Sequence, residues 1–384
     1  MNQFVFSNST NVVFTYDFIE YIIDKLDDLN VNNLLLLTDE GLSQQQLFKD
    51  FYQSLQNLKI PTTLYDKVKS DAQIAVVEEI SKLAIANDCQ LIIAIGGGSV
   101  IDTAKLVNIS LTHKDTSIMN YQGINLLESA LKPLWVIPTT AGTGSEVSLV
   151  AVAKDESSNK KIFFGSHYLS SELAILDPNL LVTLPKFLTA ATGLDAVTHA
   201  IEAYTASNCN SPITDALCIE SLKKLFAYLP TACQDPSNIE ARENTLVAST
   251  MAGIAFSNSG VGVVHALAHS IGAMFNTHHG ATNAVFLIPG IKFNCQEASR
   301  FYDTLSVNVF NDKKANHVDL ITTIDNLLNT VQLPKSLKSL GVPELSKALL
   351  DELATTALVD PSIMFNPVEL NLDDLKQIIL TAYN

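Results

Sequence analysis

Residues 91–105 read LIIAIGGGSVIDTAK, and this stretch decides the fold of the first half of the chain. Leu91–Ile95 is a continuous apolar run, which is typical of a strand buried in a parallel sheet. Three glycines and Ser99 end that strand, and the residues that follow predict a helix with Asp102 in its first turn and Lys105 in its second. A strand, a tight turn and a helix in this order indicate an α/β domain.

Strands and helices alternate on both sides of this unit. Leu34–Leu37 and Leu134–Ile137 are further continuous apolar runs, and Ile60–Tyr65 is another candidate strand. Ala72–Asn87 carries apolar residues at helical spacing, and Phe48–Leu58 reads as an amphipathic helix. This alternation predicts a mostly parallel sheet covered by helices.

The pattern changes after the LDP at residues 176–178 and is helical almost to the end. Ile213–Leu229, Ile239–Ala255 and Asp319–Val331 are examples. We therefore expect a domain boundary near Thr183. The prediction is an α/β dinucleotide-binding domain over residues 1–183 and an all-helical domain over residues 184–384.

Two glycine-rich turns follow predicted strands, GGGS at 96–99 and PTTAGTGSE at 138–146. Glycines let the backbone approach a ligand closely, and a helix start offers free N–H groups to a phosphate. The first turn matches neither GxGxxG nor the P-loop, and alone it reads equally well as a tight turn. Two such turns at the carboxyl edge of one sheet, where α/β folds bind ligands, favour a dinucleotide site.

Asp39 lies just after the predicted strand Leu34–Leu37, and two interpretations of this residue are open. A carboxylate here would hold the ribose hydroxyls of NAD and repel the extra phosphate of NADP. Alternatively, Asp39 simply begins a loop. In the standard fingerprint the acidic residue lies downstream of the glycines, whereas Asp39 lies upstream, so that arrangement does not apply.

The second half holds a candidate metal site. The segment at 193–206 reads GLDAVTHAIEAYTA, and the segment at 265–280 reads HALAHSIGAMFNTHHG. Asp195 and His199 are four apart, as are His265 and His269, and this spacing places each pair on one helix face. His279 follows 10 residues later, and one carboxylate with three of these imidazoles could surround a divalent cation. Alternatively, each histidine is a satisfied core residue, and Asp195 favours a helix N-terminus.

Composition narrows the function classes. The chain has 384 residues, of which 47% are hydrophobic and 17% charged, so it can form a sizeable core. A formal net charge of −16 argues against nucleic acid, which is bound through Lys and Arg. Five scattered cysteines without a CxxC pair fit reduced thiols in a cytoplasm. We expect neither a signal peptide nor a membrane span.

The chain resembles the iron-containing, or group III, alcohol dehydrogenase family. Five segments carry the resemblance in the family's order: GGGSVIDTAK at 96–105, PTTAGTGSEVS at 138–148, LDP at 176–178, and the two segments that hold the histidines. The resemblance implies the fold that this family shares with dehydroquinate synthase. In that fold an α/β domain binds NAD(P), and an all-helical domain holds the metal.

The resemblance also assigns roles to positions. The implied metal ligands are Asp195, His199, His265 and His279. The implied cofactor contacts are Asp39, Gly97, Gly98, Ser99, Asp102, Thr139, Thr140, Thr143, Lys161 and Leu180. Phe256 and Val150 fall at positions that line the substrate site in relatives. His269 matches a histidine near the nicotinamide, and we expect it to relay a proton as a catalytic residue.

The implied function is reversible hydride transfer between a primary alcohol and NAD(H), with NADP a less favoured cofactor. The metal is iron by resemblance, although the ligand types suit Zn(II), Co(II) or Ni(II) as well. Alternatives are a 1,3-propanediol dehydrogenase or lactaldehyde reductase of the same family, and distantly a non-redox, dehydroquinate synthase-like enzyme. The expected partners are a small alcohol or aldehyde and further copies of the chain, as a homodimer or larger assembly in the cytoplasm.

Four features of the sequence bear on how closely it follows the family pattern. Lys69-Ser70-Asp71-Ala72 replaces an Asn-Pro segment and puts one cofactor contact in doubt. Val368 follows Asn366-Pro367 where the family has arginine, and His278 precedes His279 where proline is common. Val150 stands where relatives specific for diols can carry a polar side chain, which favours simple alcohols.

Overall fold

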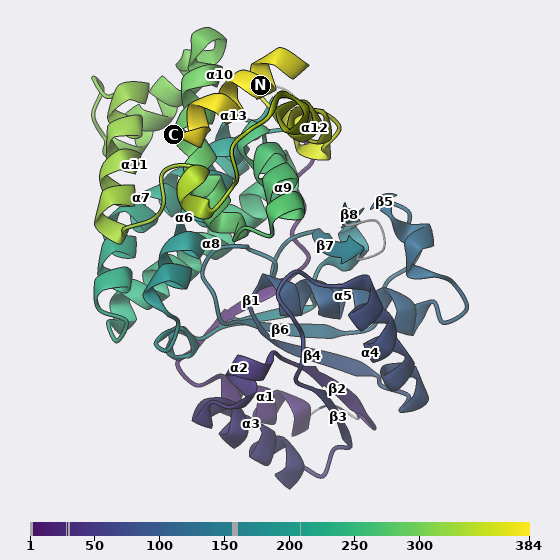
Figure 1. Cartoon of the computed structure of the whole chain (residues 1–384). Helices are drawn as coiled ribbons and strands as arrows, with labels where there is room; N and C mark the ends of the chain where they lie inside the picture. Colours follow the sequence, from purple (N-terminus) through teal and green to yellow (C-terminus); the bar gives the residue numbers. More distant parts are fainter. Residues whose placement is uncertain (1–2, 28, 30, 156–159, 208) are drawn as a thin grey trace. The chain divides into compact units, whose positions relative to one another are not determined.

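The structure is a computed structural model of the chain that describes residues 3–27, 29, 31–155, 160–207 and 209–384. It divides into two compact units. The α/β unit contains residues 7–140 and 145–183. The helical unit contains residues 184–384 together with residues 141–144 and the described part of residues 1–6. Figure 1 shows the strands of the first unit and the helices of the second.

Six parallel strands form the main sheet of the α/β unit, in the order β1-β9-β6-β4-β2-β3. Their bounds are β1 Asn11–Phe14, β2 Leu34–Leu37, β3 Thr62–Tyr65, β4 Leu91–Gly96, β6 Leu134–Pro138 and β9 Leu173–Leu176. Strands β2, β4, β6 and β9 bury every residue, which is why they read as continuous apolar runs. The predicted parallel sheet is confirmed, and the predicted strand at 34–37 has the observed bounds.

Helices cover both faces of this sheet, with α1 and α3 on one face and α4 and α5 on the other (Figure 1). The helices of this unit are α1 Phe18–Asp27, α2 Glu40–Ser43, α3 Gln46–Asn57, α4 Ile74–Ala86 and α5 Gly98–Thr112. Helix α4 buries the face that the apolar spacing predicted and leaves its other face exposed. Such packing on both sides is what an all-parallel sheet requires.

A second, smaller sheet was not predicted. Its strands are β5 Gly123–Ile124, β7 Val150–Asp155 and β8 Lys160–Gly165, in the order β5-β8-β7. Strands β7 and β8 form an antiparallel pair. Strand β7 buries alternate residues, but its sequence VAVAKD alternates only between valine and alanine. A period of two without polar contrast gives little signal.

The helical unit consists of α6 Lys186–Thr205, α7 Pro212–Gln234, α8 Ile239–Ser259, α9 Val263–Phe275, α10 His279–Phe310, α11 His317–Val331, α12 Lys347–Leu358 and α13 Leu372–Tyr383. The predicted all-helical second half is confirmed. These helices share one large apolar core, and α6 is buried almost along its whole length. Among the described residues no single helix meets the length and hydropathy needed to cross a membrane, although α8 and α9 meet them as a pair bent by 101°.

Candidate active site

Helix α6 carries three polar side chains that lie in the core. Asp195 is in the middle of this helix, so a role at a helix N-terminus is wrong. Asp195, His199 and Glu202 are 2%, 5% and 6% exposed. Spacings of four and three residues place all three on one face of the helix. Such buried polar groups need partners.

Two further helices bring imidazoles to this face. Helix α9 presents His265 and His269 one turn apart, and α10 begins at His279. The start of α10 packs tightly on α6, because a Cβ atom at Gly280 would collide with the carbonyl oxygen of Ala191. The missing side chain of this glycine permits the close approach.

Asp195, His265 and His279 converge on one point. Each offers one ligand atom, and these three atoms lie within 4.8 Å of one another. The Oδ1 atom of Asp195 is 3.7 Å from Nε2 of His265 and 3.6 Å from Nε2 of His279. One carboxylate oxygen and two imidazole nitrogens at these separations fit around a divalent transition-metal ion, whose bonds to such atoms are about 2.0–2.2 Å long.

His199 lies beside this group and is not part of it. Its ring stacks on His265 with centroids 4.5 Å apart, and on Phe256 with centroids 4.3 Å apart. Its Nδ1 atom is 3.2 Å from the carbonyl oxygen of Gly142. Burial lowers the pKa of His199 to about 4, although Asp195 acts in the opposite direction. The ring is therefore neutral near pH 7, which is the form in which imidazole binds metals.

The side-chain amide of Asn283 lies among the same three atoms. Its Nδ2 atom is 2.7 Å from Oδ1 of Asp195, 3.1 Å from Nε2 of His265 and 3.2 Å from Nε2 of His279. An amide has two hydrogens and cannot donate to three acceptors at once. Its Oδ1 atom is buried and has no hydrogen-bond partner within the described residues. Three crowded acceptors and a buried lone oxygen fit a site that a cation completes.

The charges at this site also favour a cation. Burial raises the pKa of Asp195, but the nearby imidazoles of His199, His279 and His265 hold it well below its ordinary value. Burial lowers the pKa of His265, but the nearby carboxylate of Asp195 and the hydrogen-bonded carboxylate of Glu202 outweigh that effect and raise it to about 9. The negative charges of Asp195 and Glu202 therefore favour the binding of a proton or a metal ion at this site.

His269 belongs to a different imidazole–carboxylate pair. Its Nδ1 atom is 2.9 Å from Oδ2 of Asp360, and the two side chains are 24% and 16% exposed. Oδ1 of Asp360 accepts the N–H of Ser362 at 2.9 Å, which anchors the carboxylate at the start of η5 (Pro361–Phe365). The ring of His269 stacks on His279 with centroids 5.2 Å apart. This partly exposed imidazole thus lies directly beside the metal-ligand candidates.

Sequence reasoning missed three residues of the site. Glu202 follows His199 by three positions and Asn283 follows His279 by four, so helical spacing offered a signal for both. Asp360 offered none, because it is 91 residues away from its partner in the chain.

His278, which the sequence raised as a competing ligand, precedes α10 as its N-cap residue. Its ring packs edge-on against Phe187, with centroids 5.6 Å apart. His278 is not in the group whose ligand atoms converge.

In the α/β unit the two glycine turns begin at the same edge of the main sheet. Gly96 ends β4 and pairs in register with Pro138, which ends β6. The N–H of Thr139 donates to the carbonyl oxygen of Gly96 at 3.1 Å. A Cβ atom at Gly97 would lie only 3.2 Å from the side chain of Thr140. The prediction that both turns lie at the same carboxyl edge is confirmed.

The start of α5 gathers several predicted cofactor residues. Gly97 is its N-cap residue and Gly98 its first residue. Ser99 Oγ accepts the N–H of Asp71 at 3.1 Å, and the carboxylate of Asp71 is 3.4 Å from Nζ of Lys161. Asp71 lies in the segment that departs from the family pattern. It links two predicted cofactor positions that sequence reasoning had not connected.

Other predicted positions have structural partners of their own. Asp39 caps the short helix α2, because its Oδ1 atom accepts the N–H of Leu42 at 2.9 Å. Oδ2 of Asp102 accepts the N–H of Val152 at 3.1 Å. Burial raises the pKa of Asp102, with Lys105 acting in the opposite direction.

The remaining positions are spread over both units. Leu180 is buried in η3 (Pro178–Leu181). Val150 begins β7 half-buried, and its carbonyl oxygen accepts from Nζ of Lys105 at 2.9 Å. Thr143 belongs to the helical unit, whereas the other predicted cofactor contacts belong to the α/β unit.

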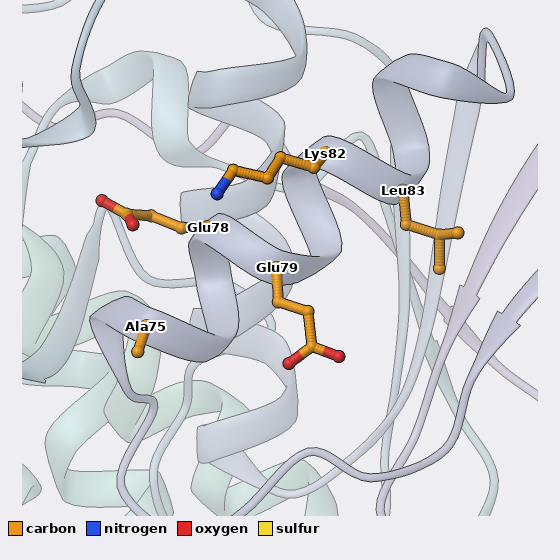
Figure 2. Close-up of a pocket in the computed structure, with 5 residues that line it drawn as sticks. All are labelled: Ala75, Glu78, Glu79, Lys82 and Leu83. Atoms are coloured by element: carbon orange, nitrogen blue, oxygen red, sulfur yellow. The ribbon is translucent and has the colours of Figure 1, made fainter.

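A surface pocket on α4 contains none of the predicted residues. Figure 2 shows its lining on that helix: Ala75, Glu78, Glu79, Lys82 and Leu83. All five residues are exposed, and they form the polar face of an amphipathic helix.

Comparison with known proteins identifies the family. The family model described as iron-containing alcohol dehydrogenase matches residues 9–178, and the model described as the C-terminal part of the Fe-containing alcohol dehydrogenase family matches residues 189–383. The chain belongs to the iron-containing alcohol dehydrogenase family. The resemblance seen in the sequence is confirmed, and the enzyme is a metal-dependent alcohol dehydrogenase.

Several relatives of this family match along almost the whole chain. The NAD-dependent methanol dehydrogenase of Bacillus methanolicus is 32% identical, over 93% of this chain and 94% of the relative. The 1,3-propanediol dehydrogenase of Klebsiella pneumoniae is 33% identical, over 91% of each chain. The structure of an alcohol dehydrogenase from Oenococcus oeni superposes with a TM-score of 0.93 at 30% identity, over 99% of this chain and 100% of that chain. The predicted fold is thereby confirmed.

Proposed function

We propose that the enzyme interconverts a primary alcohol and its aldehyde with NAD(H) and a divalent iron ion. The convergence of one carboxylate oxygen and two imidazole nitrogens within 4.8 Å is the observation that carries this proposal. We assign Asp195, His265 and His279 as metal ligands and His199 as the fourth. The neutral ring of His199, stacked on His265, supports that fourth assignment.

A bound divalent cation supplies a Lewis acid that lowers the pKa of an alcohol, and NAD supplies the hydride acceptor. The side chains of the protein would bind the cation and balance part of its positive charge. Asp195 contributes one negative charge, and the histidines contribute neutral nitrogen donors. Asn283 contributes an amide whose buried oxygen has no hydrogen-bond partner within the described residues.

We infer that His269 moves the proton that alcohol oxidation releases. Its Nδ1 atom bonds to Asp360, so Nε2 remains for exchange with substrate or solvent. The ring is 24% exposed, which gives water access to it. Imidazole is the side chain best suited to proton transfer near neutral pH.

NAD is the preferred cofactor in this proposal, with Asp39 as the residue that disfavours NADP. The carboxylate follows β2 at the carboxyl edge of the sheet. A negative charge there would repel the extra phosphate of NADP. Because Oδ1 of Asp39 also caps α2, Asp39→Asn keeps an acceptor oxygen for the cap and removes only the charge.

The Asp39 test compares kcat/KM for NADP with that for NAD. Asp39→Asn is expected to raise this ratio by roughly tenfold, which corresponds to about 1.4 kcal/mol. Asp39→Ala removes charge and cap together and serves as the matched comparison. An unchanged cofactor ratio in both variants contradicts this role of Asp39.

Simple primary alcohols are the proposed substrates. Val150 and Phe256 are apolar at the positions that the sequence assigned to the substrate. Methanol and 1,3-propanediol are alternative substrates, because relatives of this family are named for them. A polar diol is the less favoured substrate because valine at position 150 offers it no hydrogen bond.

Metal-reconstituted activity tests the function as a whole. The protein is stripped with a chelator and reloaded anaerobically with Fe(II) or Zn(II). NADH formation is then followed with ethanol, 1-butanol, 1,3-propanediol and 1,2-propanediol, and the series is repeated with NADP. We expect metal-dependent NADH formation, fastest with a simple alcohol. One metal bound per chain without turnover of any alcohol or aldehyde contradicts the proposal.

We also propose a cytoplasmic homo-oligomer, a dimer or larger. Five cysteines without disulfide partners support a reducing compartment. Light scattering on the purified protein measures the mass directly, and a monomeric mass contradicts this part of the proposal.

A further inference from the structure

Helix α9 starts without a cap from its own N-terminal residue. Gly262 precedes the helix and has no side chain to receive the free N–H groups of the first turn. Two side chains from elsewhere in the helical unit receive them. Oε1 of Glu202 accepts the N–H of Val264 at 2.7 Å, and Oδ1 of Asn366 accepts the N–H of Val263 at 3.2 Å.

Glu202 does more than cap this helix. Its second oxygen, Oε2, lies 2.6 Å from Nδ1 of His265, and the two side chains are 7% and 3% exposed. An ionised carboxylate can only accept hydrogen bonds, so Nδ1 must carry a hydrogen. The other ring nitrogen, Nε2, is 3.7 Å from Oδ1 of Asp195 and is the atom that would bind a metal ion, which would displace any proton held there.

The surroundings leave Glu202 one position. A Cβ atom at residue 262 would lie 3.0 Å from Oε1 of Glu202 and 2.9 Å from Oδ1 of Asn366, so glycine is needed there. Asn366 is fixed in turn by two hydrogen bonds with Asn294 and one with the carbonyl oxygen of Val368. Both oxygens of the Glu202 carboxylate are thus engaged, one by the N–H of Val264 and the other by Nδ1 of His265.

We propose that Glu202 is a positioning residue that sets the ring orientation and tautomer of His265 for metal binding. This inference rests on the proposed metal role of His265. A carboxylate behind a metal-bound histidine raises the ligand's basicity and fixes its tautomer, and losing one typically lowers metal affinity 10- to 100-fold. The competing explanation is that Glu202 only caps α9.

The variant Glu202→Gln separates the two explanations. Val264 and His265 contact different oxygens of Glu202, and glutamine has an NH2 group in place of one of them, so one of the two contacts loses its acceptor. If its oxygen keeps the helix cap, its NH2 group faces Nδ1 and forces the hydrogen onto Nε2, where the metal would bind. Asn366→Ala is the matched control, because Asn366 caps the adjacent N–H and does not touch His265.

The measurement is Co(II) binding to the full-length, metal-stripped protein, by competition with a chelating indicator and by the visible spectrum of bound Co(II). Thermal unfolding of the metal-free proteins is measured alongside. We expect Glu202→Gln to bind Co(II) roughly 10- to 100-fold more weakly with a changed spectrum and a near-native Tm. Asn366→Ala should lower the Tm and change Co(II) affinity less than about threefold.

Other outcomes overturn the inference in distinguishable ways. Wild-type affinity in Glu202→Gln, or equal losses of affinity in both variants, reduces Glu202 to a cap while the metal site stands. If His265→Ala binds Co(II) as tightly as the wild type, the ligand assignment in the proposed function fails, and the role of Glu202 fails with it.

Discussion

Helix α9 presents two histidines one turn apart, each paired with a carboxylate from another part of the helical unit, and the two pairs differ in their exposure to solvent. In the first pair, His265 and Glu202 are 3% and 7% exposed, and the distance between Nδ1 and Oε2 is 2.6 Å. In the second pair, His269 and Asp360 are 24% and 16% exposed, and the corresponding distance is 2.9 Å. The first pair is sealed in the core, whereas the second has access to water.

This difference assigns the two pairs to different tasks. A buried, tightly bonded imidazole offers a fixed lone pair, which suits a metal ligand. A partly exposed imidazole can exchange its proton with solvent, which suits a proton relay. We therefore propose that two histidines on consecutive turns of α9, each paired with a carboxylate from another part of the helical unit, have different functions because of the packing around them.

The largest expected difference is between His265→Ala and His269→Ala, in the amount of metal that each variant binds. His265→Ala should lose stoichiometric metal, because it removes a ligand atom and leaves Glu202 buried without its partner. The loss of affinity should exceed the roughly 10- to 100-fold that removing a supporting group costs. Metal content after gel filtration measures it. Retention of one metal per chain in this variant contradicts the ligand assignment.

His269→Ala should keep its metal and lose rate. Removal of a proton-transfer group typically lowers kcat by about 100- to 10,000-fold, and the pH dependence of kcat should change shape. The check is a pH–rate series on protein of verified metal content. An unchanged pH profile with metal bound removes the relay role from His269, whatever the absolute rate.

The variant Asp360→Asn tests how much the charge of the second pair contributes to the free energy of unfolding. Burial raises the pKa of Asp360, but His269 and Ser362 outweigh that effect and hold it well below its ordinary value. A carboxylate whose pKa is lower in the folded state stabilises the fold above its unfolded pKa of about 3.9. That contribution is lost as the pH falls through the folded value. Asparagine keeps an acceptor for the N–H of Ser362 and lacks the charge.

The free energy of unfolding of Asp360→Asn should therefore be about 2 kcal/mol below that of the wild type at pH 6, and the gap should narrow below about pH 4. Urea unfolding of the metal-free proteins across this range measures both values. A gap that stays constant down to pH 3 would mean that the charge on Asp360 does not stabilise the fold.

The sequence predicted the fold well because its signals are local. Runs such as Leu34–Leu37 reflect strands buried on both faces, and helical spacing marked the faces of α6 and α9. Long-range partners carried no such signal. Nothing near His269 in the sequence indicates Asp360, and nothing near His279 indicates that α10 packs on α6 through Gly280. These contacts follow from tertiary packing.

The histidine next to the site should give the smallest effect. His278 adjoins His279 in sequence, but its ring packs on Phe187 and it does not join the converging ligand atoms. His278→Ala should keep stoichiometric metal and change stability by no more than about 0.5 kcal/mol. Metal content and thermal unfolding measured beside His265→Ala test this. Loss of metal in His278→Ala, as expected for His265→Ala, would contradict the assignment of His278 to a packing role outside the metal site.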